Sequence, residues 1–314
     1  MPSANSASLH SADVRIRRPL AVALVVSLRP KQWTKNLIVF AGVIFGQRLT
    51  DPAALASAVS AFVAFCLLSS VVYLINDVRD READRRHPTK AKRPIAAGDL
   101  DPRVALAWAF VLGVGTLGFS FWISRAFGTI GATYLAMLGL YSTVLKHVVI
   151  LDVLTLAMGF VLRVFGGAAA VSVAVSDWLL LLVLLGALFL ALSKRRAELV
   201  TLADDARHHR PSLAEYSPSL LDQMISVVTA SMLIAYALYT IDPATISRFG
   251  TDRLVWTVPF LLYGIFRYLY LVHQREGGGD PSEILVTDRP LLVCVALWGL
   301  SVIALVYGWP VVGR

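Results

Sequence analysis

Three aspartates stand at the polar end of a long apolar run. Asp77, Asp80 and Asp84 are spaced three and four residues apart, and Asn76 precedes them. On a continuing helix this spacing places the three carboxylates on one face, where they repel one another unless a cation lies among them. Oxygen ligands favour Mg²⁺ or Ca²⁺, and Mg²⁺ usually takes one or two carboxylates and completes its shell with water and phosphates. The cluster therefore predicts a metal site formed by Asn76, Asp77, Asp80 and Asp84. The alternative is a solvated helix end whose acids pair with nearby arginines.

Basic residues follow this cluster directly. Arg85, Lys90 and Arg93 are candidates for binding a diphosphate, because such a ligand stays anionic after one Mg²⁺ has bound. The alternative explanation is the excess of positive charge that membrane proteins carry in their cytoplasmic loops.

The composition indicates which elements must position these residues. The chain has 314 residues, of which 57% are hydrophobic and 16% are charged, and its net charge is +8. Soluble domains carry roughly 25% charged residues, so the composition excludes a soluble enzyme, a disordered protein and a single-span anchor. Cys66 and Cys294 both lie in apolar runs, which argues against a disulfide framework and a zinc site. We predict an all-α polytopic membrane protein.

Apolar runs of suitable length predict nine transmembrane helices. They form a single catalytic domain over 34–310, preceded by a cytoplasmic or interfacial lead-in over 1–33. The predicted spans are 34–48, 53–76, 103–123, 127–145, 150–172, 178–194, 222–241, 254–273 and 290–309. Most of the 29 Lys and Arg residues fall in the segments on one side, which places the N-terminus and the aspartate cluster in the cytoplasm.

The motif Asn76-Asp77-x-x-Asp80-x-x-x-Asp84, followed by Arg93-Pro94, resembles the first aspartate-rich motif of the UbiA superfamily. These are nine-helix intramembrane prenyltransferases that use Mg²⁺ to hold a diphosphate. The span number, the orientation and the place of the motif extend the resemblance over nearly the whole chain. It implies a UbiA-like bundle in the cell membrane, with Mg²⁺ as cofactor and a cytoplasmic active site.

Typical members carry a second acidic motif at the cytoplasmic end of the sixth span. Here that place reads Leu192-Ser-Lys194-Arg195-Arg196-Ala-Glu198. Lys194 and Glu198 share a helix face, so an ordinary ion pair is the plain alternative. Three cations and an acid at a membrane boundary are costly, which favours function. Replacing acids with cations indicates direct phosphate contacts and a different substrate.

Five segments resemble one branch, the decaprenyl-phosphate phosphoribosyltransferases of actinobacterial cell-wall arabinan synthesis. They are Arg29–Asn36, Tyr141–Lys146, Leu151-Asp152, Gly159–Arg163 and Lys194–Glu198. The resemblance implies that phosphoribosyl pyrophosphate and a polyprenyl (decaprenyl) phosphate give polyprenylphosphoryl-5-phosphoribose and pyrophosphate. No nucleic-acid partner is expected, and the chain is compatible with a homo-oligomer.

Such a donor carries a 5-phosphate that needs its own cationic pocket. Lys194, Arg195 and Arg163 are the candidates, with Glu198 accepting hydrogen bonds from the ribose or orienting a lysine. Arg163 lies inside the fifth span, and the alternative is that it pairs with Asp152.

Two further pairs are expected near the substrates. Lys31 and Lys35, expected on one helix face at four-residue spacing beside Trp33, are candidates for the lipid phosphate. The alternative is that this segment only anchors the protein at the interface. Tyr141 and Lys146, at the inner end of the fourth span, are expected to line the pocket.

Two other functions remain open. A conventional UbiA enzyme would move a prenyl group from a prenyl diphosphate to an aromatic acceptor, but it would need acids where Lys194 and Glu198 stand. A transporter would place its charged site near the membrane midplane, whereas these charges gather at one face.

Overall fold

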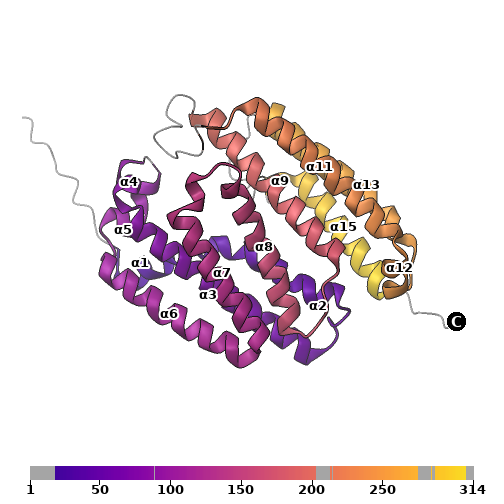
Figure 1. The fold of residues 1–314 in the computed structure, drawn as a ribbon, viewed down its shortest axis with the longest axis horizontal. Helices are drawn as coiled ribbons and strands as arrows, with labels where there is room; N and C mark the ends of the chain where they lie inside the picture. Colours follow the sequence, from indigo (N-terminus) through magenta and orange to yellow (C-terminus); the bar gives the residue numbers. More distant parts are fainter. Residues whose placement is uncertain are drawn as a thin grey trace, which may run out of the picture.

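A computed structural model describes residues 18–87, 89–202, 213, 215–274, 284 and 287–308. Helices account for all the regular structure among them (Figure 1). Residues 1–17 of the predicted lead-in lie outside this range. The long helices are α3 (Pro52–Arg79), α6 (Pro102–Ile123), α7 (Arg125–Thr143), α8 (Leu151–Ala170), α9 (Asp177–Leu202), α11 (Pro218–Ile241), α13 (Val258–Gln274) and α15 (Arg289–Tyr307). The short ones are α1 (Leu20–Ser27), η1 (Pro30–Phe40), α2 (Ala41–Phe45), α4 (Arg81–Arg86), η2 (Lys90–Lys92), α5 (Pro94–Ala97), η3 (Leu145–His147), α12 (Pro243–Phe249) and η6 (Arg253–Thr257).

Among the residues that the structure describes, seven helices are long and apolar enough to cross a membrane, so the prediction of nine is not confirmed. The predicted span 34–48 falls on η1 and α2, a 3₁₀ segment followed by a short α-helix. The predicted span 127–145 falls on α7, which is a continuous helix but lies outside the seven. The protein is thus an all-helical, multi-pass membrane protein, as the composition indicates.

Several long helices begin with the same local device, an acid or serine followed by proline. Asp51, Asp101 and Ser217 precede prolines at the first helical position, and each side chain accepts a hydrogen bond from a backbone N–H of the first turn. Such a cap satisfies an orphan donor, while proline brings the φ that a helix needs. These starts are readable in the sequence.

The first segment, formed by η1 and α2, packs closely against α8 through glycines. A Cβ on Gly167 would lie 2.0 Å from the Val39 carbonyl oxygen, and one on Gly42 would lie 2.7 Å from the Ala168 nitrogen. Only glycine permits such an approach of two backbones. This contact fixes η1 against the bundle and brings its N-terminal end near the end of α3.

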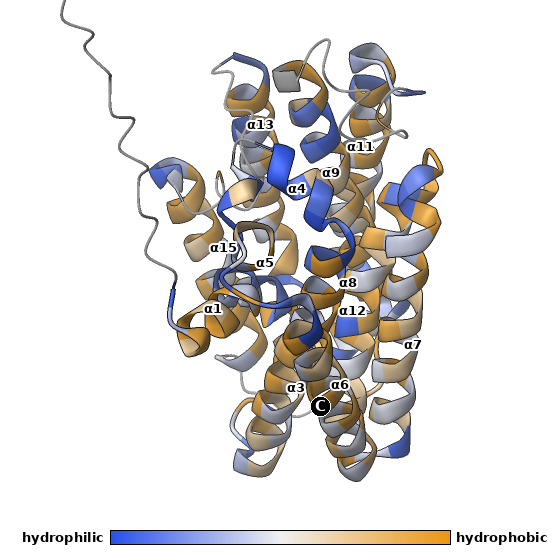
Figure 2. Cartoon of the chain, turned by 90° about the vertical axis from the view of Figure 1, so that its left-hand side faces the viewer, coloured by the Kyte–Doolittle hydropathy of each residue, from blue (hydrophilic) through white to orange (hydrophobic). Residues whose placement is uncertain are grey.

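Helix α3 ends at Arg79 and α4 begins at Arg81, with Asp80 as the residue between them. The expected continuous helix through the aspartate cluster is therefore wrong. Figure 2 shows α4 in the colours of hydrophilic residues beside long helices that are mostly hydrophobic. Backbone hydrogen bonds of 2.8 Å from Asp80 N–H to the Asn76 carbonyl and from Asp84 N–H to the Asp80 carbonyl still cross this break, so the acidic segment continues from the polar end of α3.

Candidate active site at the polar end of the bundle

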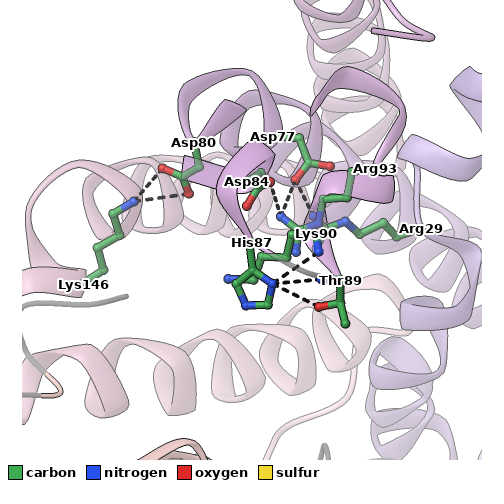
Figure 3. A network of polar contacts seen from close by, with 9 residues as sticks. All are labelled: Arg29, Asp77, Asp80, Asp84, His87, Thr89, Lys90, Arg93 and Lys146. Atoms are coloured by element: carbon green, nitrogen blue, oxygen red, sulfur yellow. Dashed lines mark hydrogen bonds and ion pairs between the residues drawn. The ribbon is translucent and has the colours of Figure 1, made fainter. Parts of the chain in front are cut away.

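Two of the three aspartates meet at one cation. A single guanidinium nitrogen of Arg93 lies 3.1 Å from Asp77 Oδ1 and 2.6 Å from Asp84 Oδ2 (Figure 3). Both carboxylates are buried. Because buried carboxylates are costly unless they are paired, Arg93 neutralises a pair that would otherwise repel.

Arg29 also belongs to this cluster, although the sequence did not single it out. Its guanidinium forms an ion pair with Asp77 and lies 4.6 Å from the centroid of the Tyr73 ring. Arg29 has φ 54°, in the left-handed region, and directly precedes η1. Forty-eight residues separate Arg29 from Asp77, so no local spacing could reveal the contact.

The third aspartate points elsewhere. Asp80 accepts a hydrogen bond from Lys146 Nζ at 3.1 Å (Figure 3). No group of three or more His, Cys, Asp or Glu side chains arranged to hold a metal occurs in the described part of the chain. In this structure Asp80 thus pairs with Lys146, apart from the Arg93 nitrogen that Asp77 and Asp84 share, and its role as a metal ligand stays a prediction.

The remaining oxygen ligands still fit a magnesium ion. Asp77 and Asp84 converge on one cationic nitrogen, and Asn76 Oδ1 is buried with no hydrogen-bond partner. Two carboxylates with a neutral oxygen are hard ligands of the kind that Mg²⁺ takes, the rest of its shell coming from water and phosphates.

The other basic candidates after the cluster make local contacts. Arg85 donates to the Ala96 carbonyl at 3.2 Å and to Glu82 at 3.0 Å, which ties α4 to α5. Lys90 is exposed beside His87, and its backbone N–H donates to the His87 ring. For Arg85 the observed contacts match the alternative of a helix end with local ion pairs.

A second polar cluster lies at the same end of the bundle, between α8 and α9. Arg195 Nε donates to Asp152 Oδ2 at 2.8 Å, and another Arg195 nitrogen donates to Glu198 Oε2 at 2.7 Å. The Arg195 side chain is only 3% exposed, whereas that of Glu198 is 34% exposed. Arg195 is thus held between two acids, and Glu198 is the member that faces outward.

Tyr216 completes this second cluster from the segment before α11. Its hydroxyl donates to Asp152 Oδ1 at 2.8 Å and accepts from the Ile150 N–H at 2.7 Å. Tyr141 lies near enough to Arg195 for an electrostatic interaction. Lys194 is half-buried on α9. The sequence pattern indicated Asp152 only as a partner for Arg163, and no local pattern indicated Tyr216.

The contacts of Arg163 differ from the pair with Asp152 that was its predicted alternative, and its phosphate-binding role stays a prediction. Its guanidinium donates to Asn36 Oδ1 at 2.6 Å, to the Tyr134 hydroxyl at 2.7 Å and to the Gly159 carbonyl at 2.9 Å. The predicted alternative, a pair with Asp152, is wrong because Asp152 binds Arg195. Arg163 is buried among neutral acceptors and ties η1 to α7 and α8.

The two lysines of the first segment do not share a face. Lys31 and Lys35 lie on the 3₁₀ helix η1, where residues three apart are aligned and residues four apart are not. Lys31 is exposed and Lys35 is half-buried. Trp33 Nε1 donates to Ser70 Oγ at 3.1 Å, so its polar atom is engaged by α3.

A cavity of about 360 Å³ lies at the other end of the bundle. Its lining includes Phe45, Asp177, Tyr239 and Arg248, which follow or precede the helix ends opposite to the aspartate cluster. It contains none of the predicted site residues.

The protein belongs to the UbiA prenyltransferase family, whose model matches residues 36–284. This confirms the resemblance drawn from the first aspartate-rich motif. The resemblance to the phosphoribosyltransferase branch is confirmed as well. The chain is 35% identical to a decaprenyl-phosphate phosphoribosyltransferase of Mycolicibacterium smegmatis, over 92% of this chain and 93% of that protein. It is also 35% identical to the protein of that name from Corynebacterium glutamicum, over 95% and 92%.

The fold is similar to solved UbiA structures. A UbiA homologue from Archaeoglobus fulgidus bound to DMAPP and Mg²⁺ superposes with a TM-score of 0.72 at 19% identity, over 90% of this chain and 99% of that one.

Proposed function

We propose that the protein transfers phosphoribosyl from phosphoribosyl pyrophosphate to a polyprenyl (decaprenyl) phosphate, as a step toward cell-wall arabinan. The products are polyprenylphosphoryl-5-phosphoribose and pyrophosphate. The observation that carries the proposal is the cluster of Lys194, Arg195 and Glu198 on α9, where a two-motif prenyltransferase would need acids. The 35% identity to two proteins named for this activity supports it.

The aspartate cluster would hold the leaving group. Asp77, Asp84 and Asn76 Oδ1 would hold Mg²⁺, with Asp80 beside them on its bond to Lys146. Bound there, Mg²⁺ would supply Lewis-acid stabilisation of the negative charge on the diphosphate. Arg93 and Arg29, which neutralise the acids in the structure, are placed to turn toward that diphosphate.

The reaction makes few demands on acid–base chemistry. An oxygen of the lipid phosphate attacks the anomeric carbon, and the bond from that carbon to the diphosphate breaks with its electron pair leaving on the diphosphate. The sugar develops oxocarbenium character, as in other glycosyl transfers. The nucleophile is already anionic at neutral pH, so positioning and electrostatics provide the catalysis.

The second cluster would hold the ribose 5-phosphate end of the donor. Lys194 would contact the phosphate, and the exposed carboxylate of Glu198 would accept from ribose hydroxyls. Arg195, buried between Asp152 and Glu198, would orient Glu198 and would not bind phosphate itself. Tyr141 lies beside it. Lys90 on its exposed turn remains a candidate for the diphosphate.

The lipid phosphate would approach from the first segment, where Lys31 and Lys35 project in different directions from η1. We place this end of the bundle, with the N-terminus, on the cytoplasmic side of the cell membrane, because most of the 29 Lys and Arg residues fall on that side.

The test is an assay of the purified protein in lipid nanodiscs with a polyprenyl phosphate, labelled phosphoribosyl pyrophosphate and Mg²⁺. We expect a lipid-linked pentose phosphate. A parallel reaction offers a prenyl diphosphate and an aromatic acceptor. A product in the second reaction only would replace our proposal with a conventional UbiA prenyl transfer.

A further inference from the structure

The connection between η3 and α8 contains a strained turn. Ile150 has φ 69° and ψ −47°, and the Leu151 N–H donates to the Val149 carbonyl at 2.8 Å. This is the γ-turn with positive φ, which is rare and strained. A β-branched residue in this region is a genuine outlier, and it persists only where its surroundings hold it.

The Tyr216 hydroxyl is the group that holds this turn. It accepts from the Ile150 N–H at 2.7 Å and donates to Asp152 Oδ1 at 2.8 Å. One oxygen atom therefore fixes both the centre of the turn and the carboxylate two residues later. Burial raises the pKa of the Tyr216 phenol, so the hydroxyl keeps the proton that it donates to Asp152.

A buried ion pair connects Asp152, which Tyr216 holds, to α9. Asp152 is fully buried, and its second oxygen accepts from Arg195. Arg195 in turn holds Glu198. Among Asp152, Arg195, Glu198 and Tyr216, only Glu198 has a substantially exposed side chain. The orientation of that exposed carboxylate is thus the outward result of a buried chain of contacts.

We infer that Tyr216 is a positioning residue for the sugar donor: it holds the Ile150 turn and Asp152, and through Arg195 it sets the direction of Glu198. The inference rests on the proposed function, because it takes the ligand of Glu198 to be the ribose of phosphoribosyl pyrophosphate. Tyr216 acts without touching the substrate.

The test compares full-length wild-type protein with Tyr216→Phe in the nanodisc assay. Phenylalanine keeps the ring and removes both hydrogen bonds. Loss of a hydrogen bond to a charged group corresponds to about a tenfold effect, so we expect the KM for phosphoribosyl pyrophosphate to rise about tenfold. The kcat and the KM for the lipid phosphate should change by less than about threefold. Hydrogen exchange of the Ile150 amide should become faster.

A double variant separates positioning from packing. Glycine adopts positive φ without strain, so Ile150→Gly added to Tyr216→Phe should keep the turn in place and lower the raised donor KM again. Tyr307→Phe is the matched control. It removes a tyrosine hydroxyl that donates to the Ile44 carbonyl at 2.8 Å at the other end of the bundle, and it should leave the donor KM unchanged.

Three results would overturn the inference. The first is an unchanged donor KM in Tyr216→Phe. The second is a loss of activity in Tyr216→Phe no different from that of the control Tyr307→Phe. The third is a double variant whose donor KM is no lower than that of Tyr216→Phe. In each of these cases the wild type still forms the lipid-linked pentose phosphate. If the wild type does not use phosphoribosyl pyrophosphate, the proposed function fails and this inference fails with it.

Discussion

Arg93 places a guanidinium nitrogen 2.6 Å from Asp84, and the same nitrogen lies 3.1 Å from Asp77. A positively charged side chain thus stands at the point where these two carboxylates meet. A metal ion held by the same carboxylates would have to displace it. Arg93 and the metal therefore compete for one position, and the displaced guanidinium becomes available to an anionic ligand.

Arg93→Gln should bind a divalent cation more tightly in the absence of substrate. Two charges 4 Å apart interact by about 4 kcal/mol near a protein surface, and since Arg93 is partly exposed we expect a gain of about tenfold in affinity after screening. Titration with Mn²⁺, followed by electron paramagnetic resonance, measures this directly. Donor affinity should fall in the same variant.

The control for this titration is Arg86→Gln, an exposed arginine of the same segment, which should leave Mn²⁺ affinity unchanged. If Arg93 only stabilises the loop, its loss would leave metal affinity unchanged or lower it.

Asp77→Asn and Asp84→Asn should each lower turnover by about 10²-fold or more, because electrostatic stabilisation of the leaving group contributes effects of that size. Initial rates at saturating substrates measure the loss. Removing one partner of a buried ion pair also destabilises a protein, so thermal unfolding must be recorded for both variants. Near-normal rates in a folded protein would show that the cluster is only a helix end.

Asp77 and Asp84 could be predicted as a pair because a spacing of seven residues is two helical turns, which a short break preserves. The separate position of Asp80 could not be predicted, because nothing in the types of Arg79, Asp80 and Arg81 indicates that α3 ends there. Its partner Lys146 lies 66 residues away. The helix starts marked by Asp-Pro were readable, because that signal is local.

The contacts of Arg29 and Tyr216 could not be predicted from sequence spacing. Arg29 binds an aspartate 48 residues away, and Tyr216 binds one 64 residues away. These contacts depend on how the helices pack. The prediction that Lys31 and Lys35 share a face is wrong for a different reason. It assumed the period of an α-helix, whereas η1 has the period of a 3₁₀ helix. Val39 of this 3₁₀ segment packs against Gly167 of α8.

Arg163→Gln should destabilise the fold and leave substrate affinities unchanged. The variant loses hydrogen bonds to Asn36, Tyr134 and Gly159 in a buried setting. Such losses cost roughly 2–4 kcal/mol in total. Thermal unfolding in detergent should show a clearly lower midpoint. A normal midpoint together with a raised donor KM would return Arg163 to the binding pocket.

Lys194→Ala should mainly weaken donor binding. Lys194 lies one turn before Glu198 on α9, so both side chains lie on the face that would receive the ribose phosphate. A lost charge-assisted contact corresponds to about a tenfold rise in the KM for phosphoribosyl pyrophosphate, with the KM for the lipid phosphate unchanged. Arg196→Ala is the matched control, since Arg196 is a cation of the same helix that pairs with Asp222 at 2.5 Å. An equal rise in donor KM for both variants would mean that the general positive charge of α9 attracts the donor and that Lys194 makes no specific contact.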